Sequence, residues 1–230
     1  EEPFWEPGKR QGYHAMTMSW TVGEVVRRVA GKSLGAFFQD EVAKPLGLDF
    51  WIGTPESVEP RISPISQLPV PKGAPLTPLA KLALADRASI PALFLFNGGG
   101  FSPNSRACHA AEIGAANGIT NARGLAGMYA ALANGGTVNG VTLVRPETVT
   151  RMGQVSMATH LDETLQMPTR FALGFMKSMD NRWQGNFANA LLTERAFGHV
   201  GAGGSIGFAD PECRMSFGYT MNRMGDGLLL

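Results

Sequence analysis

The hydrophobic pattern of this chain changes near residue 170, and that change limits the folds available to it. Before this point apolar residues recur at helical spacing, most clearly over residues 121–134. After it, short apolar segments separated by turn residues are typical of β-strands. Helices followed by a run of strands predict an α+β fold, with a helical and loop subdomain over residues 1–169 packed beside an antiparallel sheet over residues 170–230.

Local start and stop signals predict where the first helices lie. A capping-box pattern at Thr21 and Glu24 indicates one helix start, and Gly31 is a typical residue after a helix end. Ser33 then begins a second helix, which Pro45 is expected to stop. The apolar residues that share one face of the first helix are Val22, Val25, Val26 and Val29.

Further helices are expected after residues 77–78, over 121–134 and from Pro146 to Met152. In the first of these, Leu79, Leu82 and Ala83 are predicted to face inward. The proline- and serine-rich residues 49–76 and the glycine-rich residues 97–120 are expected to form long surface loops.

The strands of the last third surround one clear turn signal. Asp210-Pro211-Glu212-Cys213 predicts a hairpin turn between two of them. The expected strands are residues 171–176, 196–200, 205–209 and 215–221.

A glycine-rich stretch interrupts these strands. Four glycines fall between Gly201 and Gly207, and such glycines indicate a bend or a close approach to the backbone. The stretch contains Gly203-x-Ser205-x-Gly207, which matches the nucleophile elbow of α/β-hydrolases. That elbow requires a helix after the serine and a later histidine, whereas here a strand pattern follows and His199 is the last histidine. Ser205 is therefore not predicted to be a nucleophile.

Two residues are candidates for chemistry, and each has a structural alternative. His199 either forms hydrogen bonds within the sheet or points into a cleft that the neighbouring glycines leave open. Tyr13 follows a Pro-Gly turn and is either a packing residue or a proton carrier. A tyrosine acts as a general base only when nearby cations lower its pKa from about 10.

Charge, cysteine and histidine content exclude several classes of protein. Twenty basic and nineteen acidic residues, without a basic run, argue against a nucleic-acid partner. No apolar stretch is long enough to span a membrane. Cys108 and Cys213 are expected to be free thiols. The remaining histidines, His14, His109 and His160, lack metal-ligand spacing, so neither a metal nor another cofactor is expected.

The order of several motifs resembles that of the class C β-lactamase-like serine hydrolases, which include penicillin-binding-protein-like enzymes and family VIII carboxylesterases. The pattern Trp5-x-Pro7-Gly8-x4-Tyr13 carries the resemblance at one end, and the stretch from Phe197 to Pro211 carries it at the other. Intervening segments that look like this family are residues 23–29, 45–48, 116–118, 129–136 and 146–148. The resemblance implies the β-lactamase/transpeptidase-like fold.

The resemblance also implies roles for particular residues. The family uses a Ser-x-x-Lys pair, a tyrosine motif and a late strand with Lys-Thr-Gly or a variant such as His-x-Gly. Tyr13 matches the tyrosine, while His199 and Gly201 match the late strand. The backbone N–H of Ala202 would match the second donor of the oxyanion hole. The implied substrates are small carboxylic esters, amides or β-lactams.

This sequence departs from the family pattern in three places. His14-Ala15 stands where Ser-Asn is usual, and His199 replaces a permanent cation that would hold a β-lactam carboxylate. Both departures favour esters. In addition, no serine is followed by a lysine three residues later. The chain is therefore expected to be one incomplete catalytic domain, inactive alone and with uncovered apolar surface. A catalytically inactive scaffold and a small-carboxylate binding domain stay open as alternatives.

Overall fold

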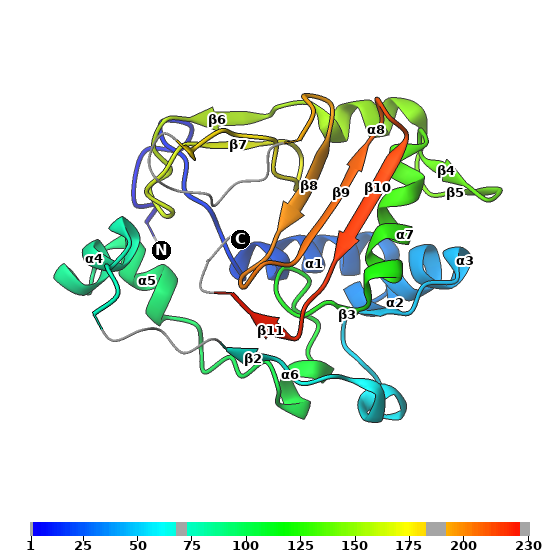
Figure 1. Cartoon of the computed structure of the whole chain (residues 1–230), viewed down its shortest axis with the longest axis horizontal. Helices are drawn as coiled ribbons and strands as arrows, with labels where there is room; N and C mark the ends of the chain where they lie inside the picture. Colours follow the sequence, from blue (N-terminus) through cyan, green and yellow to red (C-terminus); the bar gives the residue numbers. More distant parts are fainter. Residues whose placement is uncertain (1, 68–72, 183–191, 226–230) are drawn as a thin grey trace.

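The computed structural model describes residues 2–67, 73–182 and 192–225 of the chain. A three-stranded antiparallel sheet is the largest of the five sheets that the described residues form, and helices and loops make up most of the rest (Figure 1). The helices are α1 Thr17–Ala30, α2 Leu34–Phe38, the π-helix η1 Gln39–Ala43, α3 Lys44–Leu46, the 3-10 helix η2 Glu56–Arg61, α4 Pro78–Ala85, α5 Ile90–Phe96, α6 Arg106–Ala110, α7 Ala122–Ala133 and α8 Pro146–Gly153. The strands are β1 Phe50–Trp51, β2 Ser66–Gln67, β3 Ile119–Thr120, β4 Thr137–Val138, β5 Val141–Thr142, β6 Met157–Thr159, β7 Thr169–Phe171, β8 Phe197–Val200, β9 Ile206–Asp210, β10 Met215–Tyr219 and β11 Arg223–Met224.

The three-stranded sheet β10-β9-β8 is covered on one face by α7 (Figure 1). Glycines allow the helix to approach the strands closely. A Cβ atom at Gly218 would lie 2.6 Å from the backbone nitrogen of Ala126, and one at Gly207 would lie 2.5 Å from the ring of Tyr129. The resulting core is apolar, since Tyr129, Leu132, Ala133, Val149, Phe197 and Ala209 are buried together. The expected helix at 121–134, the strands from 196 onward and the hairpin turn at 210–213 are confirmed.

The start of the first helix was predicted wrongly. Helix α1 begins at Thr17, before the Thr21–Glu24 pattern, and the Glu24 carboxylate instead pairs with Arg27 and Arg28. A charged pair on the surface of a helix produces the same sequence pattern as a capping box, so spacing alone did not separate them. Gly31 does end the helix, with a left-handed φ of 68°.

Pro45 does not stop the second helix, contrary to prediction. The backbone continues from α2 through the π-helix η1 into α3, and it ends at Gly47, whose φ is 65°. In the π-turn the N–H of Lys44 bonds to the carbonyl of Gln39, so the change in hydrogen-bond register accommodates the missing N–H of Pro45.

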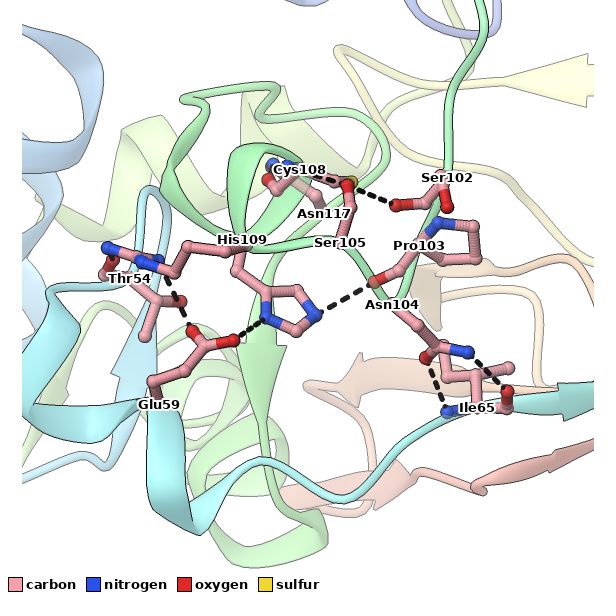
Figure 2. A network of polar contacts seen from close by, with 11 residues as sticks. Thr54, Glu59, Ile65, Ser102, Pro103, Asn104, Ser105, Cys108, His109 and Asn117 are labelled. Carbon is pink, nitrogen blue, oxygen red and sulfur yellow. Dashed lines mark hydrogen bonds and ion pairs between the residues drawn. The ribbon is translucent and has the colours of Figure 1, made fainter.

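The two segments expected to be loops contain short elements. Residues 49–76 include β1, η2 and β2, while 97–120 include α6 and β3. β1 pairs with β3 antiparallel. Figure 2 shows how side chains join the two segments. The buried His109 imidazole lies 2.8 Å from both the Glu59 carboxylate and the Pro103 carbonyl. The Asn104 side chain accepts the N–H of Ile65 and donates to its carbonyl. Such long-range polar contacts leave no periodic pattern in a sequence.

Two smaller predictions also fail. Residues 171–176 are not one strand, because β7 ends at Phe171 and the chain turns at Gly174, whose φ is 78°. After this turn, Met176 forms an isolated β-bridge with Gly198 of β8, and the Phe175 ring contacts that of Phe197. In α4 Leu79 and Ala83 are buried as expected, but Leu82 is 45% exposed.

Apolar side chains remain exposed on α1 and β10. On α1 the exposed fractions of Val22, Val25 and Val29 are 49%, 57% and 84%. The residues of β10 that point away from α7 are Met215, Phe217 and Tyr219, and all three are exposed. This observation agrees with the expected uncovered apolar surface. The division into subdomains at residues 169 and 170 stays a proposal, and it falls within β7.

Candidate active site

The structure brings Tyr13 and His199 together although 186 residues separate them in sequence. The centroids of the two rings lie 5.9 Å apart. The segment before α1 passes beside β7 (Figure 1), and the Tyr13 ring stacks on Phe171 at 5.8 Å. Phe94 from α5 meets the Tyr13 ring edge-on at 6.2 Å. Three distant parts of the chain thus contribute aromatic rings that pack around Tyr13.

His199 is a neutral imidazole in this environment. Its Nδ1 lies 2.6 Å from the carbonyl oxygen of Val200, which can only accept, so Nδ1 carries the hydrogen and Nε2 keeps a lone pair. Burial lowers the pKa of His199, and the bond to Val200 offsets this only in part. The side chain thus offers an uncharged acceptor at Nε2 in place of a fixed cation.

The depressed pKa of His199 predicts a loss of stability on mild acidification. Because the folded pKa lies below the unfolded value, the stabilisation is present above about pH 6.5 and is lost as pH falls through the folded pKa. One proton contributes at most about 1.4 kcal/mol per pH unit to the slope of the free energy of unfolding against pH. Urea unfolding between about pH 7.5 and pH 5.5 should therefore show a weaker pH dependence in His199→Asn than in the unmodified chain. His160→Gln is the matched control, since His160 is exposed; an unchanged slope in His199→Asn would contradict the assignment.

Tyr13 is a phenol, not a phenolate, at neutral pH in this chain. Burial raises its pKa, and the negative charge of Asp162 raises it further. Among the described residues, no hydrogen bond from the Tyr13 hydroxyl group offsets these effects. A role as proton acceptor therefore requires a cation in addition to the groups described.

A tight turn links β8 to β9 beside the two rings. The Gly201 N–H donates to the Ser205 carbonyl at 2.7 Å, and Gly203 and Gly204 have φ values of 81° and 113°, which favour glycine. Within the described part of the chain, the N–H of Ala202 donates to no other backbone group, and Ala202 is exposed.

Ser205 lies in this turn and not on a strand-to-helix elbow. Strand β9 begins directly after it, as expected from the sequence. A Cβ atom on Gly201 would meet the Ser205 hydroxyl oxygen, so that hydroxyl lies over the turn backbone.

The side chain of His14, next to Tyr13, is exposed and bonds to Thr17 at the start of α1.

Three further residues at the site could not be identified from the sequence. They are Phe94 and Phe171, which stand in apolar segments of the sequence, and Asp162. The Asp162 carboxylate is fully buried and accepts the backbone N–H of Tyr13 at 3.0 Å. Asp-x-Thr-Leu signals a local turn at most, because nothing in it points to a partner 149 residues away.

Comparison with known proteins decides the family. The Beta-lactamase family model matches residues 1–228. This chain belongs to the Beta-lactamase family. Its fold is the α+β, β-lactamase/transpeptidase-like fold expected from the motifs.

Members of the Beta-lactamase family similar to this chain include esterases. The chain is 32% identical to the Esterase/beta-lactamase LipL of Mycobacterium tuberculosis, over 97% of its own length and 52% of that protein's. A family VIII carboxylesterase structure superposes with a TM-score of 0.82 at 34% identity, covering 99% of this chain and 57% of that one. A penicillin-binding protein homologue from Caulobacter crescentus gives a TM-score of 0.80 at 32% identity, covering 99% and 57%. The chain thus spans little more than half the length of these relatives.

The relatives named here are thus an esterase/beta-lactamase, a carboxylesterase and a penicillin-binding protein homologue. Among the described residues, no group of three or more histidine, cysteine or acidic side chains could hold a metal ion. None of the helices described is both long and apolar enough to cross a membrane. Cys108 and Cys213 are free thiols, as expected.

Proposed function

We propose that this chain forms one wall of the active site of a serine hydrolase that cleaves small carboxylic esters through an acyl-serine. The serine nucleophile would come from a residue outside these 230 residues. In the proposed reaction the serine oxygen attacks the ester carbonyl, the alcohol leaves with a proton, and water then cleaves the acyl-serine. Amides would react by the same route.

The observation that carries this proposal is the convergence of Tyr13, His199 and the Ala202 N–H at one end of β8. The two rings are 5.9 Å apart, and the turn that holds Ala202 begins two residues after His199. Tyr13 would relay the proton that the serine loses. The N–H of Ala202, beside Gly201, would bind the carbonyl oxygen as it becomes negative, which is typically worth about 3–4 kcal/mol.

The electrostatics of the site favour esters over β-lactams. A β-lactam carboxylate requires a cation at the late strand, whereas His199 is half-buried there and its pKa is lowered, which favours the uncharged imidazole. The walls provided by Phe94 and Phe171 are apolar and suit an uncharged acyl or alcohol group. A small neutral ester therefore fits these walls better than a carboxylate-bearing lactam.

Turnover of two substrates tests the proposal. A polypeptide that extends this chain upstream through a Ser-x-x-Lys segment should hydrolyse p-nitrophenyl acetate with a kcat/KM at least about a hundredfold above that for nitrocefin. The 230-residue chain by itself should hydrolyse neither above the buffer rate.

Two results would contradict the proposal. A longer polypeptide that folds and contains Ser-x-x-Lys but turns over neither substrate would support a catalytically inactive scaffold instead. Preference for nitrocefin over the ester would overturn the assignment of substrate class and leave the serine mechanism standing.

A further inference from the structure

The loop between β6 and β7 holds a buried carboxylate that has no cationic partner in the described part of the chain. Asp162 is 0% exposed and takes part in none of the ion pairs there. A buried charge without a counter-ion is costly unless hydrogen bonds satisfy it. The structure must therefore provide several donors to the two carboxylate oxygens.

Four hydrogen bonds satisfy this carboxylate. Oδ1 accepts the backbone N–H groups of Thr164 and Leu165, each at 2.9 Å, which shapes the loop itself. The same oxygen accepts the N–H of Tyr13 at 3.0 Å. Oδ2 accepts the hydroxyl of Thr169 at 3.3 Å. One carboxylate oxygen thus joins its own loop to the backbone of the candidate catalytic tyrosine.

Neighbouring contacts hold the same two segments in register. The carbonyl of Gln11 accepts the N–H of Glu163 at 2.8 Å, and the Gln11 side chain donates to Thr169 at 3.0 Å. Between them, Gly12 passes so close that a Cβ atom there would lie 2.9 Å from the Thr164 hydroxyl oxygen. Residues 11–13 therefore lie against the 162–169 loop, with Asp162 at the end where the Tyr13 ring turns toward His199.

We propose that Asp162 is a positioning residue for Tyr13, which fixes the backbone of the tyrosine so that its hydroxyl group meets the reacting atoms. The inference rests on the proposed serine hydrolase function for its catalytic consequence. In this proposal the location of the acceptor oxygen Oδ1, and not the negative charge of Asp162, positions Tyr13. In fact the charge opposes ionisation of Tyr13, so charge alone would hinder a general base.

Two substitutions separate acceptor geometry from charge. Asp162→Asn keeps an acceptor oxygen in place and removes the charge, whereas Asp162→Glu keeps the charge and displaces the oxygens by one methylene. The asparagine amide can donate to the Thr169 hydroxyl oxygen, which also accepts from the Gln11 side chain at 3.0 Å. Thr169→Val is the matched control, because it removes the hydroxyl that bonds to Oδ2 and to the Gln11 side chain and leaves the three N–H bonds to Oδ1 in place.

The first measurement is amide hydrogen exchange at Tyr13 in the 230-residue chain, by NMR, which does not depend on catalysis. Asp162→Glu should speed exchange of the Tyr13 N–H by about tenfold or more relative to amides of the α7 core. Asp162→Asn and Thr169→Val should stay within about threefold of the unmodified chain. Equal protection of the Tyr13 N–H in all four proteins would overturn the proposal. If Asp162→Glu does not fold, rapid exchange of this amide in folded Asp162→Asn would overturn it.

The second measurement is ester hydrolysis by the longer polypeptide, normalised to the number of active serines. Asp162→Glu should lower kcat by about tenfold to a hundredfold with KM within about threefold, and Asp162→Asn should keep at least about a third of kcat. An inactive but folded Asp162→Asn, or a fully active Asp162→Glu, would overturn the positioning role. If Tyr13→Phe is itself fully active, the proposed function fails, while the exchange result at Tyr13 stands on its own.

Discussion

Tyr13→Phe should lower kcat/KM for p-nitrophenyl acetate by about a hundredfold to ten-thousandfold in the longer polypeptide that supplies the serine. The substitution removes one hydroxyl group and keeps the ring that stacks on Phe171 and lies 5.9 Å from His199. The aromatic packing should therefore survive, and the loss should fall on kcat with little change in KM.

Tyr219→Phe is the control for this prediction, because Tyr219 is an exposed residue on β10. It should leave both kinetic constants unchanged. If Tyr13→Phe keeps more than about a third of the activity, Tyr13 is a packing residue, which is the structural alternative that the sequence left open.

Gly198→Ala should destabilise the chain by about 3 kcal/mol, the upper end of the range for an overpacked site. A Cβ atom at Gly198 would lie 2.1 Å from the carbonyl oxygen of Gly207 and 2.5 Å from Phe208, and both neighbours belong to the paired strand β9. Backbone atoms cannot move aside as the end of a flexible side chain can. The β8–β9 pairing that presents His199 should separate or distort.

Equilibrium urea unfolding measures this effect, with Gly98→Ala as the control. Gly98 lacks a left-handed φ, and the nearest atom to its added Cβ would be the terminal methyl of Met16 at 3.6 Å, an ordinary contact. The control should change the free energy of unfolding by less than about 0.5 kcal/mol. Equal stability of Gly198→Ala and Gly98→Ala would show that the strands tolerate a side chain at residue 198.

Much of the fold could be predicted where local pattern and tertiary packing agree. The period of 3.6 residues placed α7, and the turn at Asp210–Cys213 placed the hairpin of β9 and β10. Prediction failed where one local sequence pattern is compatible with two structures. Glu24 pairs with arginines on the helix surface and does not cap α1. A change to π-helical hydrogen bonds lets the backbone continue past Pro45.

The candidate site was predicted only in part, because its residues come together through long-range contacts. Tyr13 and His199 were each singled out from the sequence, but only the family resemblance placed them in one site. The role of Asp162 could not be predicted, because its bond to the Tyr13 backbone spans 149 residues and involves no side chain of Tyr13. Residue spacing carries information about neighbours on one helix or strand, not about such long-range backbone contacts.

The most direct test of the account is covalent labelling with a fluorophosphonate probe, followed by peptide mapping. The 230-residue chain should not be labelled, because Ser205 lies in the turn before β9 and its hydroxyl sits over the backbone of Gly201. In the longer polypeptide the probe should label one serine, in a Ser-x-x-Lys sequence upstream of Tyr13, and Tyr13→Phe should slow that labelling. Stoichiometric labelling of Ser205 in either protein would contradict the account and make Ser205 the nucleophile.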